Sequence, residues 1–176
     1  MTEPSIKGSI FKGVIDDLVR LQREGRISQE EVDARLATED LALLECEITA
    51  SAWYPIESYG RLMDLLGEIE GGDKDAYFLE RGRGSARRLM EIGLYQQLSF
   101  LSRWDSVLGA ARDDQSAVIA DYARNLRMVV SLASAIYNVG KWAVEPDSEH
   151  PKRVCIAVRE ARAYTDPMRL AIEGFL

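Results

Sequence analysis

The sequence has little histidine and little cysteine. It contains one histidine and two cysteines among 176 residues, which leaves few protein ligands for a zinc or iron site. Cys46 and Cys155 are far apart and lack the C-x-x-C spacing of zinc ribbons and thioredoxin-like motifs. Because free cysteine is among the most buried residue types, we expect two reduced thiols in the core rather than a disulfide.

An excess of positive charge is also absent. There are 22 Lys and Arg against 29 Asp and Glu, which gives a formal net charge of −7 and a pI near 4.9. This balance argues against a general nucleic-acid-binding protein, which needs a basic face to neutralise phosphates. With only 5 prolines and 13 glycines, the composition excludes a fibrous or low-complexity chain.

Long hydrophobic runs are missing too. The longest uncharged stretch, Met128 to Gly140, is shorter than the ~20 residues that a bilayer-spanning helix needs. The N-terminus has no basic segment followed by an apolar one, so it does not resemble a secretory signal. We therefore expect no membrane span and a cytoplasmic location.

The composition does provide enough apolar material for a core. Hydrophobic residues make up 47% of the chain and charged residues 29%, which is typical of a globular protein. Since domains commonly contain ~100–200 residues, the length predicts one domain over residues 1–176. Within it we expect a flexible segment over 1–7, a helical part over 8–140, and a hairpin followed by a helix over 141–176.

Apolar residues recur at helical spacing over most of the chain. The first such segment is Gly8–Glu24, with Gly25 placed to cap its end. Ser28 and Glu31 then have the spacing of a capping box. Further helices are predicted over Thr38–Leu44, from Pro55 to Ile69, from Asp73 to about Arg103 with a bend near Gly82 and Gly84, and over Arg112–Asn138.

After Gly140 the hydrophobic pattern changes from helical to alternating. Lys141–Glu145 and Arg153–Arg159 alternate, and the segment between them is rich in turn residues, which predicts a β-hairpin. Asp166 and Pro167 then start a last helix to Phe175. This order predicts a helix-dominant α+β fold, with N-terminal helices, a β-hairpin near 141–160 and a C-terminal helix.

Several segments resemble known proteins. Gly8-Ser-Ile-Phe-Lys-Gly-Val-Ile is similar to the opening helix of haem–nitric-oxide-binding domains, and Tyr54-Pro-Ile-Glu-Ser-Tyr is similar to a helix that feeds their core pocket. The order of the closing elements resembles the wider superfamily, which includes four-vinyl-reductase-type sensor domains and TRAPP trafficking subunits. Trp53-Tyr-Pro-Ile, Gly93-Leu-Tyr-Gln-Gln-Leu and Ile172-Glu-Gly-Phe-Leu resemble a family of myxobacterial paralogues of similar length.

The resemblance implies this fold and a bacterial signalling role in which a ligand or partner is sensed, but it carries over no active residue. Haem-binding members present a histidine from a helix and a Tyr-x-Ser-x-Arg motif. Here the single histidine, His150, lies in the predicted turn, and that motif does not occur. We therefore expect no haem and no other cofactor. The superfamily also completes its sheet with a second hairpin after the last helix, and the sequence ends at Leu176.

One group of basic residues could bind an anion. Four arginines lie close together in the segment around Gly82 and Gly84, and arginine matches carboxylate and phosphate oxygens with paired hydrogen bonds. The alternative is an exposed helix face whose arginines pair with Glu80, Glu91 and Asp75. The candidates for binding a ligand or partner are Arg81, Arg83, Arg87 and Arg88.

Aromatic residues form a second group of candidates, because an aromatic-lined cavity suits a small apolar ligand. The alternative is that they are simply core residues, as aromatic side chains at helical spacing usually are. The candidates are Trp53, Tyr59, Tyr95, Trp104 and Tyr137.

These features favour a non-enzymatic protein. Adjacent carboxylates such as Asp16 and Asp17 point to solvent on an amphipathic helix, and His150 has no nucleophile motif to act with. We expect an interaction or sensor domain that forms a homodimer and binds a protein partner. The alternative is a protein that binds a small apolar ligand between the central helices and the hairpin.

Overall fold

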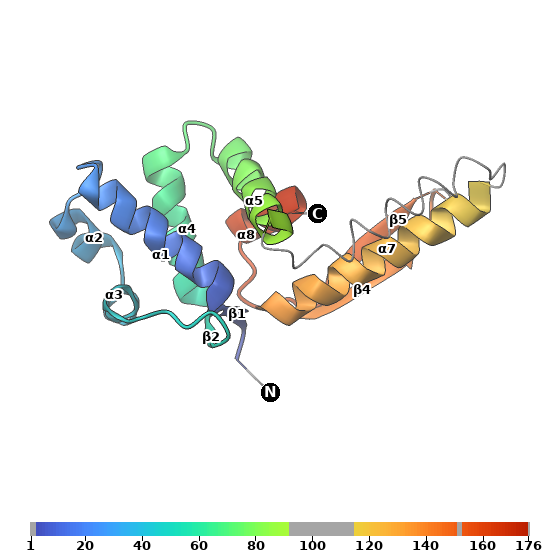
Figure 1. Ribbon diagram of the computed structural model, residues 1–176, viewed down its shortest axis with the longest axis horizontal. Helices are drawn as coiled ribbons and strands as arrows, with labels where there is room; N and C mark the ends of the chain where they lie inside the picture. Colours follow the sequence, from blue (N-terminus) through green and yellow to red (C-terminus); the bar gives the residue numbers. More distant parts are fainter. Residues whose placement is uncertain (1–2, 92–114, 151–152, 176) are drawn as a thin grey trace.

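The computed structural model describes residues 3–91, 115–150 and 153–175, and it confirms the helix-dominant α+β fold (Figure 1). In chain order the elements are β1 (Ser5–Lys7), α1 (Gly8–Arg23), α2 (Gln29–Arg35), α3 (Thr38–Glu45), β2 (Trp53–Pro55), α4 (Ile56–Glu70), α5 (Lys74–Glu91), α7 (Gln115–Ile136), β3 (Tyr137–Asn138), β4 (Lys141–Pro146), β5 (Val154–Arg159) and α8 (Asp166–Phe175). In the part of the chain that is described, no helix combines the length and the apolar character needed to cross a bilayer.

The beginning of the chain folds as its local signals predict. The apolar face of α1 is buried, and Gly25 follows the helix with a φ of 70°, the left-handed conformation that glycine adopts most readily. Ser28 caps α2 with the predicted capping box, since its hydroxyl accepts from the Glu31 amide while the Glu31 carboxylate accepts from the Ser28 amide. These elements form one side of the helical body, by which we mean α1 to α5 and α8 (Figure 1).

A small three-stranded sheet was not predicted. Its order is β2-β1-β3, all antiparallel, with Ile6 opposite Tyr54 on one side and Tyr137 on the other. Residues 5–7 were expected to be flexible, but they form the central strand and Ile6 is fully buried. Strands of two or three residues are too short to show an alternating pattern, so the sequence gives no signal for them.

Helix α5 packs closely against α8. Gly82 of α5 lies so near the Ala171 carbonyl that a Cβ atom would overlap it, and Gly174 of α8 meets the Leu79 carbonyl in the same way. The bend expected near Gly82 and Gly84 is therefore wrong, because α5 continues through both residues. Gly82 serves close helix packing rather than flexibility.

The hairpin formed by β4 and β5 is as predicted, with Trp142 opposite Val158 and Val144 opposite Ile156. Helix α7 packs against β4, whereas the final helix, α8, packs on α5 and α4. We call α7, β4 and β5 together the arm, because they extend away from the helical body (Figure 1). The predicted start of the long helix before residue 115 lies outside the described residues.

Two further expectations about single residues are wrong. Cys46 and Cys155 are free but exposed, because Cys46 follows the end of α3 and Cys155 lies on the outward face of β5. Phe175, the last residue of α8, is buried against the core.

Candidate functional site

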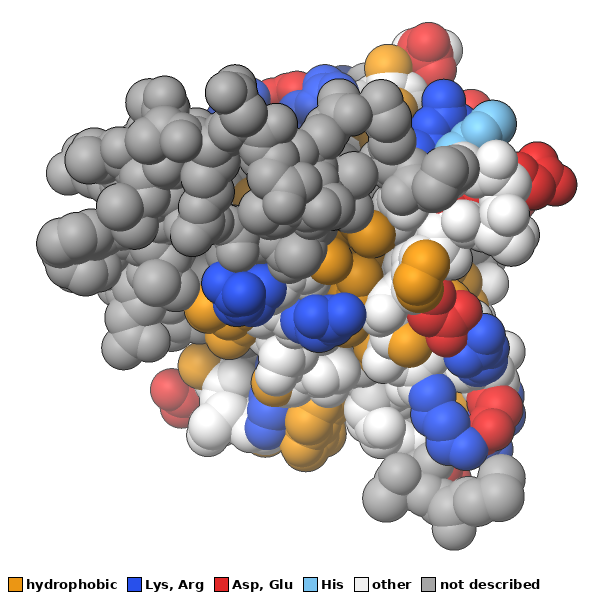
Figure 2. Space-filling view, turned by 90° about the vertical axis from the view of Figure 1, so that its right-hand side faces the viewer, with side chains coloured by type: hydrophobic (Ala, Val, Ile, Leu, Met, Phe, Trp, Pro, Cys, Tyr) orange, Lys and Arg blue, Asp and Glu red, His pale blue; other side chains and the backbone are white. Residues whose placement is uncertain are grey.

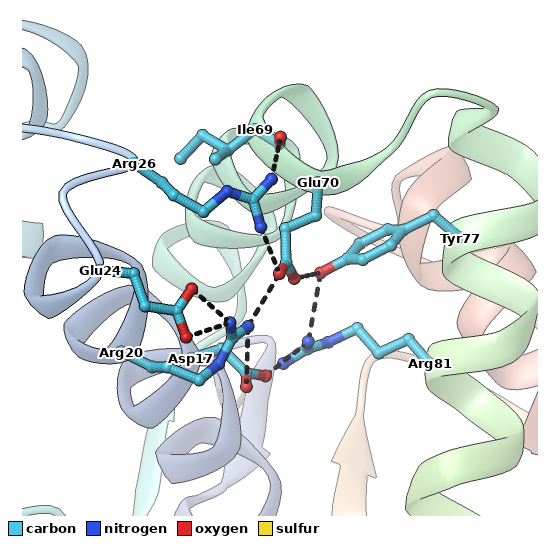
Figure 3. A network of polar contacts seen from close by, with 8 residues as sticks. All are labelled: Asp17, Arg20, Glu24, Arg26, Ile69, Glu70, Tyr77 and Arg81. Atoms are coloured by element: carbon cyan, nitrogen blue, oxygen red, sulfur yellow. Dashed lines mark hydrogen bonds and ion pairs between the residues drawn. The ribbon is translucent and has the colours of Figure 1, made fainter.

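A network of charged side chains joins α1, α4 and α5 (Figure 3). Arg81 extends from α5 to α1, where its Nη1 lies 2.6 Å from Asp17 Oδ2. The same nitrogen lies 3.3 Å from the Tyr77 hydroxyl, which in turn donates to Glu70 at 3.3 Å. The network therefore fixes the position of the Arg81 guanidinium from two sides.

Glu70, at the end of α4, is the second centre of this network. It accepts hydrogen bonds from Arg20 at 2.8 Å and from Arg26 at 3.2 Å. Burial alone would raise the pKa of Glu70, but the contacts with Arg20 outweigh it, and the pKa is lowered. Glu70 is therefore ionised at neutral pH and holds α1 against α4.

Arg81 is largely withdrawn from solvent, with 11% of its side chain exposed. Burial would lower the pKa of its guanidinium, but the neighbouring Tyr59, Tyr77 and Asp17 outweigh burial and raise it. The residue therefore provides a fixed positive charge beneath the surface. The sequence pattern grouped Arg81 with the exposed arginines. Its burial results from the packing of α5 against α1, which the sequence pattern does not indicate.

A cavity of about 340 Å³ lies between α1, α4 and α5, beside this guanidinium. Its lining includes Lys12, Asp16, Tyr59, Arg81, Arg88 and Glu91. The expected apolar cavity was placed elsewhere, between the central helices and the hairpin. The charged lining of this one suits a polar ligand.

The other arginines of the cluster differ from one another. Arg83 and Arg87 are exposed and pair with Glu80, at 3.4 Å and 2.9 Å, as the exposed-face interpretation predicted. Arg88 is exposed as well, but it forms no ion pair with any residue that the structure describes. Of the four arginines, one is fixed, two are paired and one has no ion pair among the described residues.

The aromatic candidates also lie in different environments. Tyr59 and Tyr137 are buried in the core, as the alternative interpretation predicted, and burial raises the pKa of both hydroxyls; Tyr59 also borders the cavity. Trp53 is 45% exposed on β2, with the Lys7 ammonium 4.1 Å from its ring centroid. Tyr95 and Trp104 lie outside the described residues.

Sequence reasoning missed Asp17, Glu70 and Tyr77. It assigned Asp16 and Asp17 together to a solvated face, yet Asp16 pairs with Lys12 on the surface whereas Asp17 turns inward to Arg81. Successive side chains on a helix point about 100° apart, so a helical-wheel projection of the sequence could have placed Asp16 and Asp17 on different faces. The described residues contain no group of three or more metal-ligating side chains.

Comparison with family models, with curated proteins and with solved structures found no match to this chain. The resemblance to the haem–nitric-oxide-binding superfamily therefore stays a prediction.

Proposed function

We propose that the protein is a non-enzymatic interaction module that self-associates through its arm and binds a protein partner. The observation that carries this proposal is the incomplete sheet of the arm. β4 and β5 form a sheet of two strands, and none of their residues is fully buried in the described structure. A two-stranded hairpin is marginally stable in water and normally gains a third strand or a covering helix.

In this arm the helix covers only part of the sheet. α7 packs on β4, and among the described residues neither β4 nor β5 has a further strand beside it. Unpaired strand edges present backbone donors and acceptors to another chain. Figure 2, which faces the end of the arm, shows hydrophobic side chains at the surface among charged ones.

A second copy of the chain is the simplest occupant of these edges. Closed twofold dimers are the commonest soluble oligomers, and identical hairpins can extend each other's sheet across the twofold axis. The alternative is that charged residues protect the edges of a monomer. Arg159 pairs with Glu145 and Lys141 with Glu160 on the hairpin itself, so these charges are already used within the sheet.

Cross-linking through the two exposed cysteines tests where the copies meet. A bismaleimide should join two copies through Cys155 on β5, so the dimer band should persist in Cys46→Ser and vanish in Cys155→Ser. A band that depends on Cys46 would place the contact away from the hairpin.

A charge placed on the hairpin tests the contact by a second route. Ala157 lies on β5 opposite Ala143, and a lysine there should disrupt edge pairing. Ala34→Lys makes the same change on an exposed position of α2 and should leave the mass in solution unchanged. Equal masses for both variants would contradict the proposal.

A buried polar group favours a second candidate function, the binding of a small ligand between the helices and the hairpin. The Trp142 indole N–H is buried without a hydrogen-bond partner among the described residues, and its ring lies 6.5 Å from that of Tyr137. A ligand that brought an acceptor here would relieve the unpaired donor. Native mass spectrometry of freshly purified protein would detect a retained ligand, whereas a dimer without added mass favours the interaction module.

We further propose that the chain takes no haem. His150 is exposed in the loop between β4 and β5, where its backbone amide donates to Asp147 at 3.0 Å. Reconstitution with haemin should give no stoichiometric complex. A sharp Soret band that disappears in His150→Ala would contradict this prediction.

A further inference from the structure

We propose that the cavity between α1, α4 and α5 binds the carboxylate group of a small molecule, between Arg81 and Arg88. This site is separate from the arm and does not depend on self-association. The cavity of about 340 Å³ is at the small end of the range for ligand sites, so the ligand is small.

The two arginines lie on one stripe of α5. They are seven residues apart, close to two helical turns, and Ser85 lies between them on the same face. All three line the cavity. The Ser85 hydroxyl donates to the Arg81 carbonyl at 3.1 Å, so a carboxylate in this space would meet two guanidinium groups from a single rigid helix.

Arg81 is prepared for this role. Its Nη1 is held by Asp17 and by the Tyr77 hydroxyl, which sets the plane of the guanidinium before any ligand arrives. A guanidinium has five N–H donors, and these two contacts involve only one of its three nitrogens, while the Tyr59 hydroxyl is a further neighbour of the group. A donor that is already ordered loses little conformational entropy on binding.

Arg88 provides a charge that pairs with no carboxylate of the described residues. Lys12, which also lines the cavity, is held by Asp16 at 2.7 Å. Arg88 has no ion pair with the described residues, so its full charge is available to a ligand. Arginine pairs with carboxylate oxygens through two parallel hydrogen bonds.

The acidic residues of the cavity limit the charge of the ligand. Asp16 and Glu91 line the same space, and they would repel a second negative charge on the ligand. A carboxylate with one negative charge is therefore favoured over dianionic phosphate.

Gly13 of α1 keeps the cavity open. A Cβ atom at this position would meet no atom within 4 Å, so there is room for a side chain that the sequence does not place there. Gly13→Leu should fill this space without disturbing the packing of α1.

A titration of the full chain followed by NMR or calorimetry tests the site. The probes are acetate, succinate, glycine and inorganic phosphate, each at the same ionic strength, with sodium chloride as the reference. We expect saturable binding of acetate or glycine, with the dianions succinate and phosphate weaker. A response to glycine but not acetate would show that the ligand amino group is recognised as well, which is consistent with Glu91 in the wall.

Three variants, one of them a matched control, test whether binding occurs at this cavity. Arg88→Met and Gly13→Leu should each weaken binding at least tenfold, whereas Arg83→Met, which removes an arginine paired with Glu80, should leave it unchanged. Because Arg88 and Arg83 are both exposed, both variants should fold. The proposal is overturned if no carboxylate binds, if phosphate binds more tightly, or if Arg88→Met and Arg83→Met behave alike.

Discussion

At the scale of single residues, Asp40 carries a charged group in a place that is closed to solvent. Its side chain is fully buried, and Arg61 binds it through two nitrogens at 2.6 Å and 2.8 Å. Burial alone would raise the pKa of Asp40, but hydrogen bonds from Arg61 and Ser58 outweigh it, so the pKa is lowered. The pair fixes α3 to α4.

Asp40→Asn should reduce the free energy of unfolding by about 2 kcal/mol at pH 7, because it weakens charge-assisted hydrogen bonds in a buried place. A lowered pKa gives stabilisation that is complete above the unfolded-state value of about 4 and is lost as the pH falls through the folded-state value. The difference between wild type and variant should therefore narrow below about pH 4. Urea unfolding at pH 7 and pH 3 measures it.

Glu39→Gln is the matched control for this prediction. Glu39 also contacts Arg61, at 3.2 Å, but 66% of its side chain is exposed. Its loss should change stability by no more than about 0.5 kcal/mol. Equal effects of the two variants would show that burial does not set the strength of these contacts.

Arg81 should differ from the other arginines of its cluster. Arg81→Met removes the partner of Asp17 and should cost about 2 kcal/mol, because a charged hydrogen bond in a largely buried place is lost. Replacing Arg83, Arg87 and Arg88 together by alanine should cost within about 0.5 kcal/mol for each position, since all three are exposed. Thermal unfolding followed by circular dichroism separates the outcomes, and a collapse of the triple variant would contradict this account.

At the scale of elements, the two glycines of α5 have opposite roles. A Cβ at Gly82 would overlap the Ala171 carbonyl of α8, whereas a Cβ at Gly84 would meet no atom within 4 Å. Both residues lie inside the same helix, where alanine is favoured over glycine. Alanine substitutions at the two positions therefore separate the effect of helix propensity on stability from the effect of helix packing.

Gly82→Ala should lower stability by about 2 kcal/mol, because α8 must move away from α5. Gly84→Ala should raise stability by about 0.5–1 kcal/mol through reduced backbone entropy in the unfolded chain. Urea unfolding of both variants at one pH tests the pair. Stabilisation by Gly82→Ala would mean that α5 and α8 do not approach closely.

Elements with strong local signals were predictable and those made by tertiary contact were not. The capping box at Ser28, the turn at Gly25 and the alternating hairpin strands appear in the structure where the sequence indicated. The strands β1 and β3 are too short for a pattern and arise because Ile6 pairs with Tyr54 and Tyr137 across long sequence distances.

Prediction of the candidate site from the sequence is limited in the same way, because burial depends on tertiary packing. The sequence identified the arginine cluster, but it could not separate Arg81 from its exposed neighbours, since burial depends on where α1 lies. It also placed both cysteines inside on statistical grounds, whereas Cys46 is exposed just after α3 and Cys155 is exposed on β5. Residue type predicts average burial, and packing decides the individual case.

At the scale of the whole molecule, the helical body and the arm differ in how completely they bury apolar surface. The body contains nearly all of the fully buried side chains, from α1, α4 and α8 in particular. No residue of β4 or β5 is fully buried in the described structure. The proposed self-association is therefore expected to involve the arm and to leave the body unchanged.

Light scattering of the wild-type chain over a wide dilution series around micromolar concentration tests this claim most directly. The account predicts a mass about twice that of the 19.7 kDa monomer at the upper concentrations, falling on dilution only if the contact is weak. A mass near 19.7 kDa at every concentration would contradict the proposal that the arm joins two copies of the chain.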